Sequence, residues 1–318
     1  MSLGKLDPKE LGASVLPYKG WDDPRVQLWP RLGGDGGVVE LENTILSMSS
    51  DPITGASRLI GRLSVVVNAN DIAALGGEPE WMLMTLLVPE SWGGDSIGKI
   101  MESAHRKAKD LQIAIVGGHT EKVEGLKGPI LCGSIIGSNE RFLDPSSVSS
   151  GDRLVIIGTA GLEGTAILAD TFRDKLENSG VSRESIEEAT DLYEDLCVLS
   201  QARSVRDHAL LMHDPTEGGV MGGIGELSKL IEGGIKVRKE KIPVASLTKE
   251  ICSALDVDPL RLISSGALLA IVKKEELPLM EKGLGGFEVE QIGEVSPDEG
   301  SYEIGQDELW RVLEDRDG

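Results

Sequence analysis

Three aspartates in the first half of the sequence lie where carboxylates from different elements could meet. Asp35 lies inside the glycine-rich run 33–37, Asp51 follows an apolar, strand-like segment, and Asp71 interrupts the apolar pattern of a helix. Carboxylate oxygens are hard ligands that suit Mg²⁺ held together with substrate phosphates. The spacing also fits a simpler interpretation, in which Asp35 and Asp51 are turn residues and Asp71 faces solvent.

A second candidate is the glycine-rich segment Gly117-Gly118-His119-Thr120-Glu121, which directly follows a predicted strand. Glycines and polar residues at the carboxyl end of a strand are where α/β sheets present backbone N–H groups to ligands. Such a loop could bind phosphate, and Thr120 would add a hydroxyl donor. A simple turn is the alternative interpretation.

A third candidate begins at His213 and leads into a predicted helix from Val220. Asp214 would cap that helix, Pro215 would take its first position, and Glu217 would complete a capping box. Capping does not explain the glycines nearby, because each costs about 1 kcal/mol relative to alanine inside a helix. Their density predicts close approach by another backbone, or an anion at the helix N-terminus. These glycines are Gly218, Gly219, Gly222, Gly223 and Gly225.

Other chemical motifs are absent or incomplete. The segment 93–99 has the spacing of a P-loop, but Ile100 stands where a serine or threonine must reach the metal. The four histidines show no metal-binding spacing. The cysteines at 132, 197 and 252 form no Cys-x-x-Cys pair, and we interpret all three as packed thiols in a reducing compartment.

The apolar pattern predicts that these candidates lie on alternating strands and helices. Two short strands should span 38–41 and 44–48, followed by a helix over 57–75 that ends at Gly76-Gly77. A buried strand over 81–88 and an amphipathic helix from Asp95 to about Leu111 should follow. The last two strands of this half are predicted at 113–116 and 130–136.

The composition changes to Pro, Ser, Gly and Asp around 144–152, which is typical of a domain connection. We therefore expect an α/β domain over 1–143 and a second one over 151–318. The second should contain a strand at 153–157, a strand at 268–272, and three helices. Those helices are predicted over 186–202, 220–231 and 275–282, and the acidic tail should form one amphipathic turn around 309–313.

The charge balance excludes one broad class of partner. The chain has 318 residues with 53 acidic and 32 basic side chains, giving a net charge of −21. A basic surface is needed to neutralise phosphates, so we expect no binding to nucleic acid. The first twenty residues lack the pattern of a signal peptide, and no run approaches the ~18 apolar residues of a membrane span. We expect a cytoplasmic protein that does not bind membranes.

The candidate segments, taken in order, resemble the AIR synthase (PurM-type) superfamily of ATP-using enzymes. The matching motifs are Gly34-Asp35-Gly36-Gly37-Val38, Ser50-Asp51-Pro52, Ile60-Gly61-Arg62-Leu63, Asn70-Asp71-Ile72-Ala73 through Pro79, Gly117 to Glu121, and Asp214 to Gly219. The residues of these motifs are most similar to those of the HypE-like hydrogenase expression/formation proteins.

The resemblance implies a two-domain α/β subunit whose N-terminal domain pairs with its twin to form a barrel across a homodimer. It implies an ATP-binding cleft with Mg²⁺ held by Asp35, Asp51 and Asp71, and catalytic roles for Asp71 and His119. The residues that would contact the nucleotide are Asp35, Asp51, Asn68, Asn70, Gly117, Gly118, Thr120, Asp214, Thr216, Glu217, Gly218 and Gly219. The chemistry shared by the superfamily is phosphoryl transfer to a substrate oxygen.

Three departures from the family pattern leave alternatives open. Gly34 replaces an aspartate, His119 replaces an acid, and no cysteine follows Cys252, whereas HypE carries an acceptor cysteine at its C-terminus. Our first hypothesis is an ATP- and Mg²⁺-dependent enzyme acting on a small molecule. The second is a non-catalytic nucleotide-binding partner protein of hydrogenase-maturation type. The third is a metal-dependent hydrolase that uses His119 and His213.

Overall fold

The structure is a computed structural model that describes residues 4–54, 59–280, 286–297, 302 and 304–314. The chain forms two compact units. The N-terminal unit comprises residues 21–29 and 35–142, and the C-terminal unit comprises residues 1–20, 30–34 and 143–318. This division differs from the expected domains, 1–143 and 151–318, mainly because the first twenty residues belong to the C-terminal unit.

The N-terminal unit is built on a six-stranded sheet with the order β1-β2-β3-β6-β4-β5. Only β4 and β5 pair in parallel, and the helix α3 connects them as a crossover. The strands are β1 (Val26–Leu28), β2 (Gly37–Leu41), β3 (Thr44–Thr54), β4 (Glu78–Pro89), β5 (Ala114–Val123) and β6 (Ile130–Asn139).

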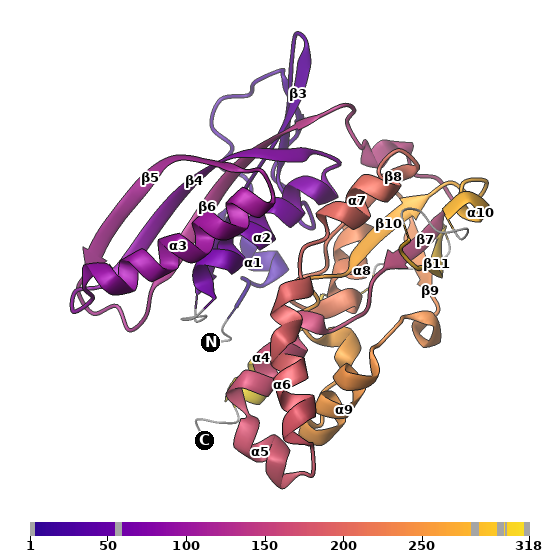
Figure 1. The fold of residues 1–318 in the computed structure, drawn as a ribbon. Helices are drawn as coiled ribbons and strands as arrows, with labels where there is room; N and C mark the ends of the chain where they lie inside the picture. Colours follow the sequence, from indigo (N-terminus) through magenta and orange to yellow (C-terminus); the bar gives the residue numbers. More distant parts are fainter. Residues whose placement is uncertain (1–3, 55–58, 281–285, 298–301, 303, 315–318) are drawn as a thin grey trace. The chain divides into compact units, whose positions relative to one another are not determined.

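Two helices, α2 (Ile60–Ala74) and α3 (Gly94–Asp110), cover the same face of this sheet (Figure 1). Helix α2 is buried along its whole length, and it crosses α3 so closely that a Cβ on Gly61 would lie 2.1 Å from the carbonyl oxygen of Ile100. It ends before Gly76, whose φ of +81° favours glycine. The opposite face of the sheet leaves large apolar side chains exposed, among them Trp81, Leu83 and Met48.

The predicted strand at 113–116 is longer than expected, because it continues as β5 to Val123. The segment 117–121, which we expected to be a loop, therefore lies inside an edge strand paired with β4. A bulge at Val116 shifts the register, since Met82 pairs with Ile115 and Leu83 pairs with Gly117. The expected helix start at Ser57 lies outside the described residues.

The C-terminal unit contains an antiparallel five-stranded sheet with the order β8-β10-β7-β11-β9. Its central strands are buried on both faces, which explains their continuous apolar sequences. The strands are β7 (Arg153–Ile157), β8 (Ala209–His213), β9 (Gly234–Val237), β10 (Leu268–Val272) and β11 (Val289–Ser296).

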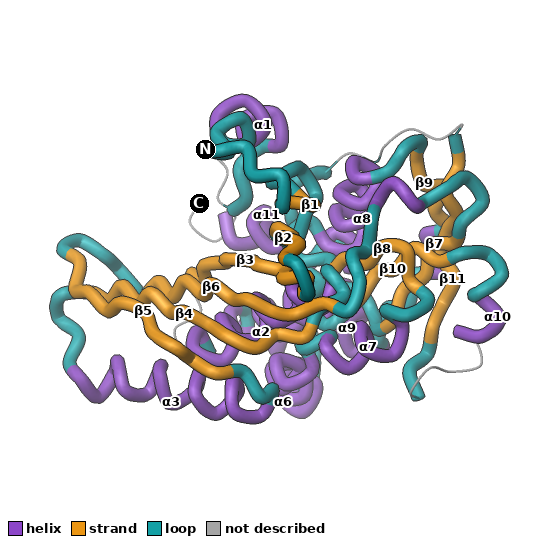
Figure 2. Tube along the Cα trace, turned by 90° about the horizontal axis from the view of Figure 1, so that it is seen from above, coloured by secondary structure: helices purple, strands orange, loops and turns teal. Residues whose placement is uncertain are grey.

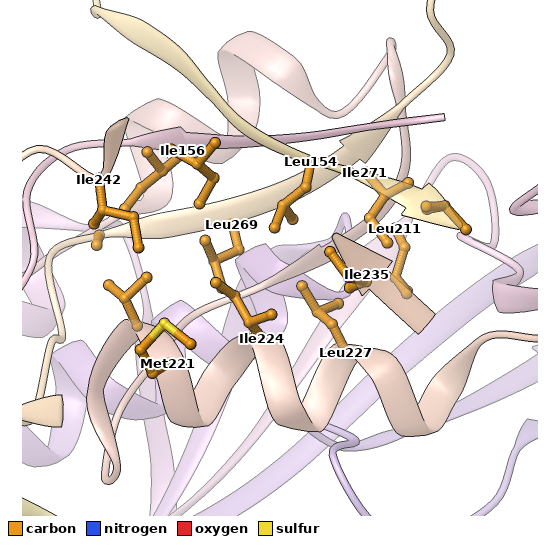
Figure 3. Close-up of a cluster of buried hydrophobic side chains, with 14 of the residues drawn as sticks. Leu154, Ile156, Leu211, Met221, Ile224, Leu227, Ile235, Ile242, Leu269 and Ile271 are labelled. Atoms are coloured by element: carbon orange, nitrogen blue, oxygen red, sulfur yellow. The ribbon is translucent and has the colours of Figure 1, made fainter. Parts of the chain in front are cut away.

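Helix α8 packs against the sheet, and the apolar side chains between them form the main core of this unit. Figure 3 shows Met221, Ile224 and Leu227 of α8 pointing at Leu154 and Leu269 on the strands. The helices of the unit are α1 (Pro8–Ser14), α4 (Leu162–Thr171), α5 (Arg173–Asn178), α6 (Arg183–Asp191), α7 (Leu199–Val205), α8 (Gly219–Leu230), α9 (Ser246–Leu255), α10 (Leu277–Met280) and α11 (Glu308–Glu314). Their course is traced in Figure 2. In the described part of the chain, no helix combines the length and apolarity needed to cross a membrane.

The prediction of a single helix over 186–202 is wrong. The chain forms α6, a 3₁₀ turn over Leu192–Asp195, and then α7. The carbonyl oxygen of Asp195 in this turn lies close to Gly266 in the loop before β10, where a Cβ would lie 3.0 Å from it. The amphipathic turn expected around 309–313 is confirmed as α11, whereas the expected end of a helix at Lys282 lies outside the described residues.

The three cysteines are free thiols, as expected. Cys252 is buried in α9, and Cys132 and Cys197 are half-buried. Burial raises the pKa of the Cys252 thiol to about 12, and Asp258 and Glu308 act in the same direction. Cys252 is therefore an uncharged core side chain at neutral pH.

Candidate functional site

We call Asp35, Asp51 and Asp71 the acidic cluster; Asp51 lies on β3, Asp71 lies on α2, and Asp35 lies just before β2. Asp71 is only 5% exposed, although it lies in the last turns of a helix. The hydroxyl of Ser49 on β3 donates a hydrogen bond to its Oδ2 at 2.6 Å. The interpretation of Asp71 as a solvent-facing helix residue is therefore wrong, since the helix is buried on all sides.

Asn68 of α2 holds the backbone of Asp51, which lies two residues after Ser49 on β3. The Asn68 side chain accepts a hydrogen bond from the backbone N–H of Asp51 at 3.0 Å and donates one to its carbonyl oxygen at 3.3 Å. It also donates to the carbonyl oxygen of Ser64 at 2.8 Å. Asn68 is completely buried, and its amide is used to join α2 to β3.

Asp35 lies two residues before β2, whose first residue, Gly37, pairs with Met48 of β3. Gly36 allows close approach to β3, because a Cβ at that position would lie 2.3 Å from the carbonyl oxygen of Met48. Gly36 therefore serves close backbone packing against β3.

The acidic cluster has the donor types that suit Mg²⁺, but it is not a complete metal site. Among the described residues, no three His, Cys, Asp or Glu side chains lie close enough together to hold a metal ion. Magnesium commonly takes one or two carboxylates and completes its shell with water and substrate phosphates. Asp51 and Asp71, on two elements joined by Asn68, are carboxylates of the kind that such an ion takes. Asn70 is completely buried beside Asp71.

The segment 117–120 lies on the same row of the sheet as Asp51, at the opposite edge. Asp51 pairs with Gly133, Gly133 with Met84, and Met84 with Gly118. Three strand spacings of about 4.8 Å separate the two ends of this row by about 14 Å. A single ion therefore cannot contact both ends.

At this edge of the sheet, Gly118 lies tightly against β4, whereas His119 is exposed. Gly118 has a φ of +151°, and a Cβ there would lie 1.9 Å from the carbonyl oxygen of Met84. His119 is exposed, and its Nε2 lies 3.4 Å from a carboxylate oxygen of Glu121. Thr120 is also exposed. The backbone N–H groups of a paired strand are oriented by the sheet, so the expectation of a free glycine loop does not describe this segment.

In the C-terminal unit, residues 214–219 form what we call the glycine turn, between β8 and α8. Helix α8 begins at Gly219 with Gly218 as its N-cap, so the capping box predicted at Asp214 and Glu217 is wrong. Gly218 and Gly219 both have positive φ, +91° and +66°. This left-handed pair turns the chain away from β8, and α8 begins at Gly219, within one residue of the predicted 220–231 and not at Pro215 as the capping pattern indicated.

The glycines of α8 are explained by neighbouring segments of the same chain. A Cβ on Gly219 would lie 2.6 Å from the carbonyl oxygen of Leu260, and one on Gly223 would lie 2.8 Å from Pro215. A Cβ on Gly225 would lie 3.1 Å from Ile304. Of the two explanations for these glycines, close backbone approach is confirmed.

A charged network lies directly beside the glycine turn, in which His213 and Glu226 are buried and Lys5 is half exposed. His213 Nε2 lies 2.9 Å from Glu226 Oε2, and Lys5 Nζ lies 3.2 Å from the other oxygen. Burial acts to raise the pKa of Glu226, but the charge of Lys5 and the hydrogen bond from His213 outweigh it and lower the pKa to about 2. Lys5 also donates to Thr216 Oγ1 at 3.3 Å, and its backbone N–H donates to Glu217 Oε1 at 2.8 Å.

Two further carboxyls are buried close by. The hydroxyl of Ser265 donates to Glu163 Oε2 at 2.5 Å. Burial raises the pKa of Glu163 to about 7, and Asp307 raises it further although the Ser265 hydrogen bond lowers it. Burial also raises the pKa of Asp307 to about 6, against the backbone hydrogen bonds that lower it. Both groups can therefore gain or lose a proton near neutral pH.

Sequence reasoning missed four of these residues, namely Lys5, Glu163, Glu226 and Asp307. Glu163 and Glu226 occupy core-facing helix positions, and an acid in an otherwise apolar stripe is a signal that could have been found. Lys5 and Asp307 carry no such signal, since each lies in an irregular, polar segment near one end of the chain.

Comparisons with known proteins place both halves of the chain in one family. Residues 33–138 match the N-terminal domain of the AIR synthase related proteins, and residues 149–305 match the C-terminal domain. A carbamoyl dehydratase HypE of Bradyrhizobium diazoefficiens is 28% identical over 286 residues, which cover 85% of this chain and 80% of the relative. A thiamine-monophosphate kinase of Pyrococcus abyssi is 26% identical over 277 residues, covering 81% and 83%.

Solved structures share the fold. A crystal structure of the hydrogenase maturation protein HypE in complex with ATP matches with a TM-score of 0.62 at 22% identity, covering 92% of this chain and 87% of that one. The expected mixed α/β fold with two PurM-like domains is confirmed by this match and by the two matching domains.

Proposed function

The chain belongs to the AIR synthase related proteins, and from this premise we propose that it is a Mg²⁺-dependent, ATP-binding enzyme. The proposed reaction transfers a phosphoryl group from ATP to an oxygen of a small substrate. One relative is named a carbamoyl dehydratase and another a thiamine-monophosphate kinase, and a structural neighbour was crystallised with ATP. These names support an ATP-using enzyme without defining the substrate.

The observation that carries the proposal is the placement of Asp71. The Asp71 carboxylate is buried and accepts a hydrogen bond from Ser49 of β3. Asn68, on the same helix as Asp71, also joins that helix to β3, so the carboxylate is held in one position. Phosphoryl transfer requires mainly positioning and neutralisation of phosphate charge, which Mg²⁺ bound to fixed carboxylates supplies. In the proposed site, Asp35, Asp51 and Asp71 would hold the ion together with the phosphates, and Asn70 would support them.

The remaining proposed contacts are carried over from the family pattern. On the N-terminal unit these are Asn68, Gly117, Gly118 and Thr120, with His119 as a catalytic group. On the C-terminal unit they are Asp214, Thr216, Glu217, Gly218 and Gly219. Within this second group Thr216 and Glu217 are the partly exposed residues, so a ligand would meet their side chains first.

Calorimetric titration of the protein with ATP, with and without Mg²⁺, tests this proposal. We expect Mg²⁺-dependent binding, and no binding of ATP at millimolar concentrations would refute it. Asp71→Asn keeps the size of the side chain and removes its charge, so it should weaken Mg-ATP binding at least tenfold. Asp95→Asn, at an exposed position in α3, is the matched control and should leave the affinity unchanged.

A homodimer is part of the same proposal, as is a cytoplasmic location. The open face of the N-terminal sheet exposes 42% of Trp81, 48% of Leu83 and 58% of Val116. A contiguous apolar sheet face of this kind favours association, and a second copy offers the same face in an isologous contact. ATP binding without consumption in single-turnover assays against candidate substrates would instead favour a non-catalytic partner protein of hydrogenase-maturation type.

A further inference from the structure

The Asp307 carboxylate joins the glycine turn to the C-terminal helix. Asp307 is 1% exposed. Its Oδ2 accepts a hydrogen bond from the backbone N–H of Gly218 at 2.6 Å, and its Oδ1 accepts one from Leu309 at 2.8 Å. The second bond caps α11, and the first supplies an acceptor to α8, because glycine has no side chain with which to cap its own helix. One carboxylate thus serves two helix N-termini.

The segment that carries Asp307 is anchored in the core. Leu309 and Val312 of α11 are buried in one apolar cluster with Leu176 of α5 and Ile251 of α9. Moving Asp307 away from Gly218 would require this helix to leave the core, which would expose apolar surface at a cost of about 25 cal/mol per Å². The carboxylate is therefore a fixed part of the framework and not a displaceable occupant of the turn.

Thr216 and Glu217 lie in the middle of the glycine turn. Both residues are partly exposed, whereas the other members of the turn are buried. The carbonyl oxygen of Thr216 accepts hydrogen bonds from Gly219 at 3.0 Å and from Ser264 at 3.3 Å. Because Gly218 directly follows Glu217, its bond to Asp307 fixes the backbone of the turn, while the side chains of Thr216 and Glu217 accept hydrogen bonds from Lys5.

We propose that Asp307 is a positioning residue that holds the backbone of the glycine turn in the geometry required to bind ATP through its Mg²⁺-bound phosphate groups. This inference rests on the proposed function, in which the glycine turn lies on the phosphate side of the nucleotide. Asp307 acts through the backbone of Gly218 and does not itself contact the ligand.

Two substitutions test this role. Asp307→Ala removes both acceptors, whereas Asp307→Asn keeps the side-chain volume and retains one acceptor oxygen. A hydrogen bond to a charged group contributes enough that its loss should weaken Mg-ATP binding about tenfold or more. Adenosine binding should change less than twofold, because adenosine lacks phosphates. Asp144→Ala is the matched control, since Asp144 caps a 3₁₀ turn through Ser146 at 2.9 Å and is not bonded to the glycine turn.

Titrations should be made at a temperature at which the near-ultraviolet circular dichroism of each variant matches that of the wild type. Hydrogen–deuterium exchange of the peptide containing residues 214–219 should become faster in Asp307→Asn and stay unchanged in Asp144→Ala. Unchanged or tighter Mg-ATP binding by Asp307→Asn would overturn the inference while the proposed function stands. If the wild type does not bind Mg-ATP, the proposed function fails, and exchange alone decides whether Asp307 fixes the turn.

Discussion

Replacing Glu163 with glutamine should change how the stability of this protein depends on pH. Glu163 is a buried acid in the first turn of α4, and the Ser265 hydroxyl donates to it. Burial, with a further contribution from Asp307, raises its pKa from the ordinary value of 4.5 to about 7. Glutamine has nearly the same shape and can still accept the Ser265 hydrogen bond, but it cannot ionise.

The size of the effect follows from the pKa difference. The shift is 7 − 4.5 = 2.5 units, and each unit corresponds to 1.36 kcal/mol, which gives about 3 kcal/mol. The folded protein binds this proton more tightly than the unfolded chain does. The contribution of Glu163 to stability is therefore largest below pH 4.5 and is lost as the pH rises through 7. Glu163→Gln removes this loss.

Urea denaturation at pH 5 and at pH 8.5 measures the difference. Relative to the wild type, Glu163→Gln should be more stable at pH 8.5 than at pH 5 by up to about 3 kcal/mol. Glu188→Gln, at an exposed position in α6, should show the same relative stability at both values. A Glu163→Gln difference that does not change with pH would refute the argument, because the wild-type carboxyl would then titrate normally.

Three further changes test other parts of the structure. Glu226→Gln should cost about 3 kcal/mol at neutral pH in urea denaturation, because it removes the buried negative charge that pairs with Lys5, and a neutral effect would contradict this pairing. Gly118→Ala should destabilise by about 3 kcal/mol through strain and collision with β4, whereas Gly117→Ala should cost under about 1 kcal/mol; equal losses in the two melting curves would contradict the difference. Leu83→Glu on the open sheet face should convert a dimer to a monomer in light scattering, while Leu279→Glu should not, and a persistent Leu83→Glu dimer would show that the contact lies elsewhere.

Much of the N-terminal unit could be predicted from the sequence, because its elements follow clear periodicities. Helix α3 shows apolar residues at three- and four-residue steps, and helix α2 stops at the glycine pair that follows it. The extent of β5 was not predictable in this way. Residues 117–121 are glycine and polar residues on an exposed edge, so their pairing with β4 leaves no apolar alternation.

The candidate sites were only partly predictable. The aspartates of the acidic cluster were found from their positions beside turns and their family motifs, but the buried state of Asp71 depends on tertiary packing of α2. The start of α8 was predicted to within one residue, but its cap was not, because the local capping signal of Asp214 competes with contacts from Leu260 and Leu262 that lie far away in the sequence. The role of Asp307 could not be predicted, because its Oδ2 accepts a hydrogen bond from Gly218, which lies 89 residues earlier in the chain.

The division of the chain into units affects the order in which it can fold during synthesis. Residues of the N-terminal unit from 35 to 142 form a continuous stretch that can fold once it has left the ribosome. Lys5 belongs to the other unit, and its partner Glu226 is separated from it by 221 residues. The segment that contains Lys5 is translated before Glu226 and must wait for more than two hundred residues to follow. The first described residues to emerge are thus among the last to reach their native contacts.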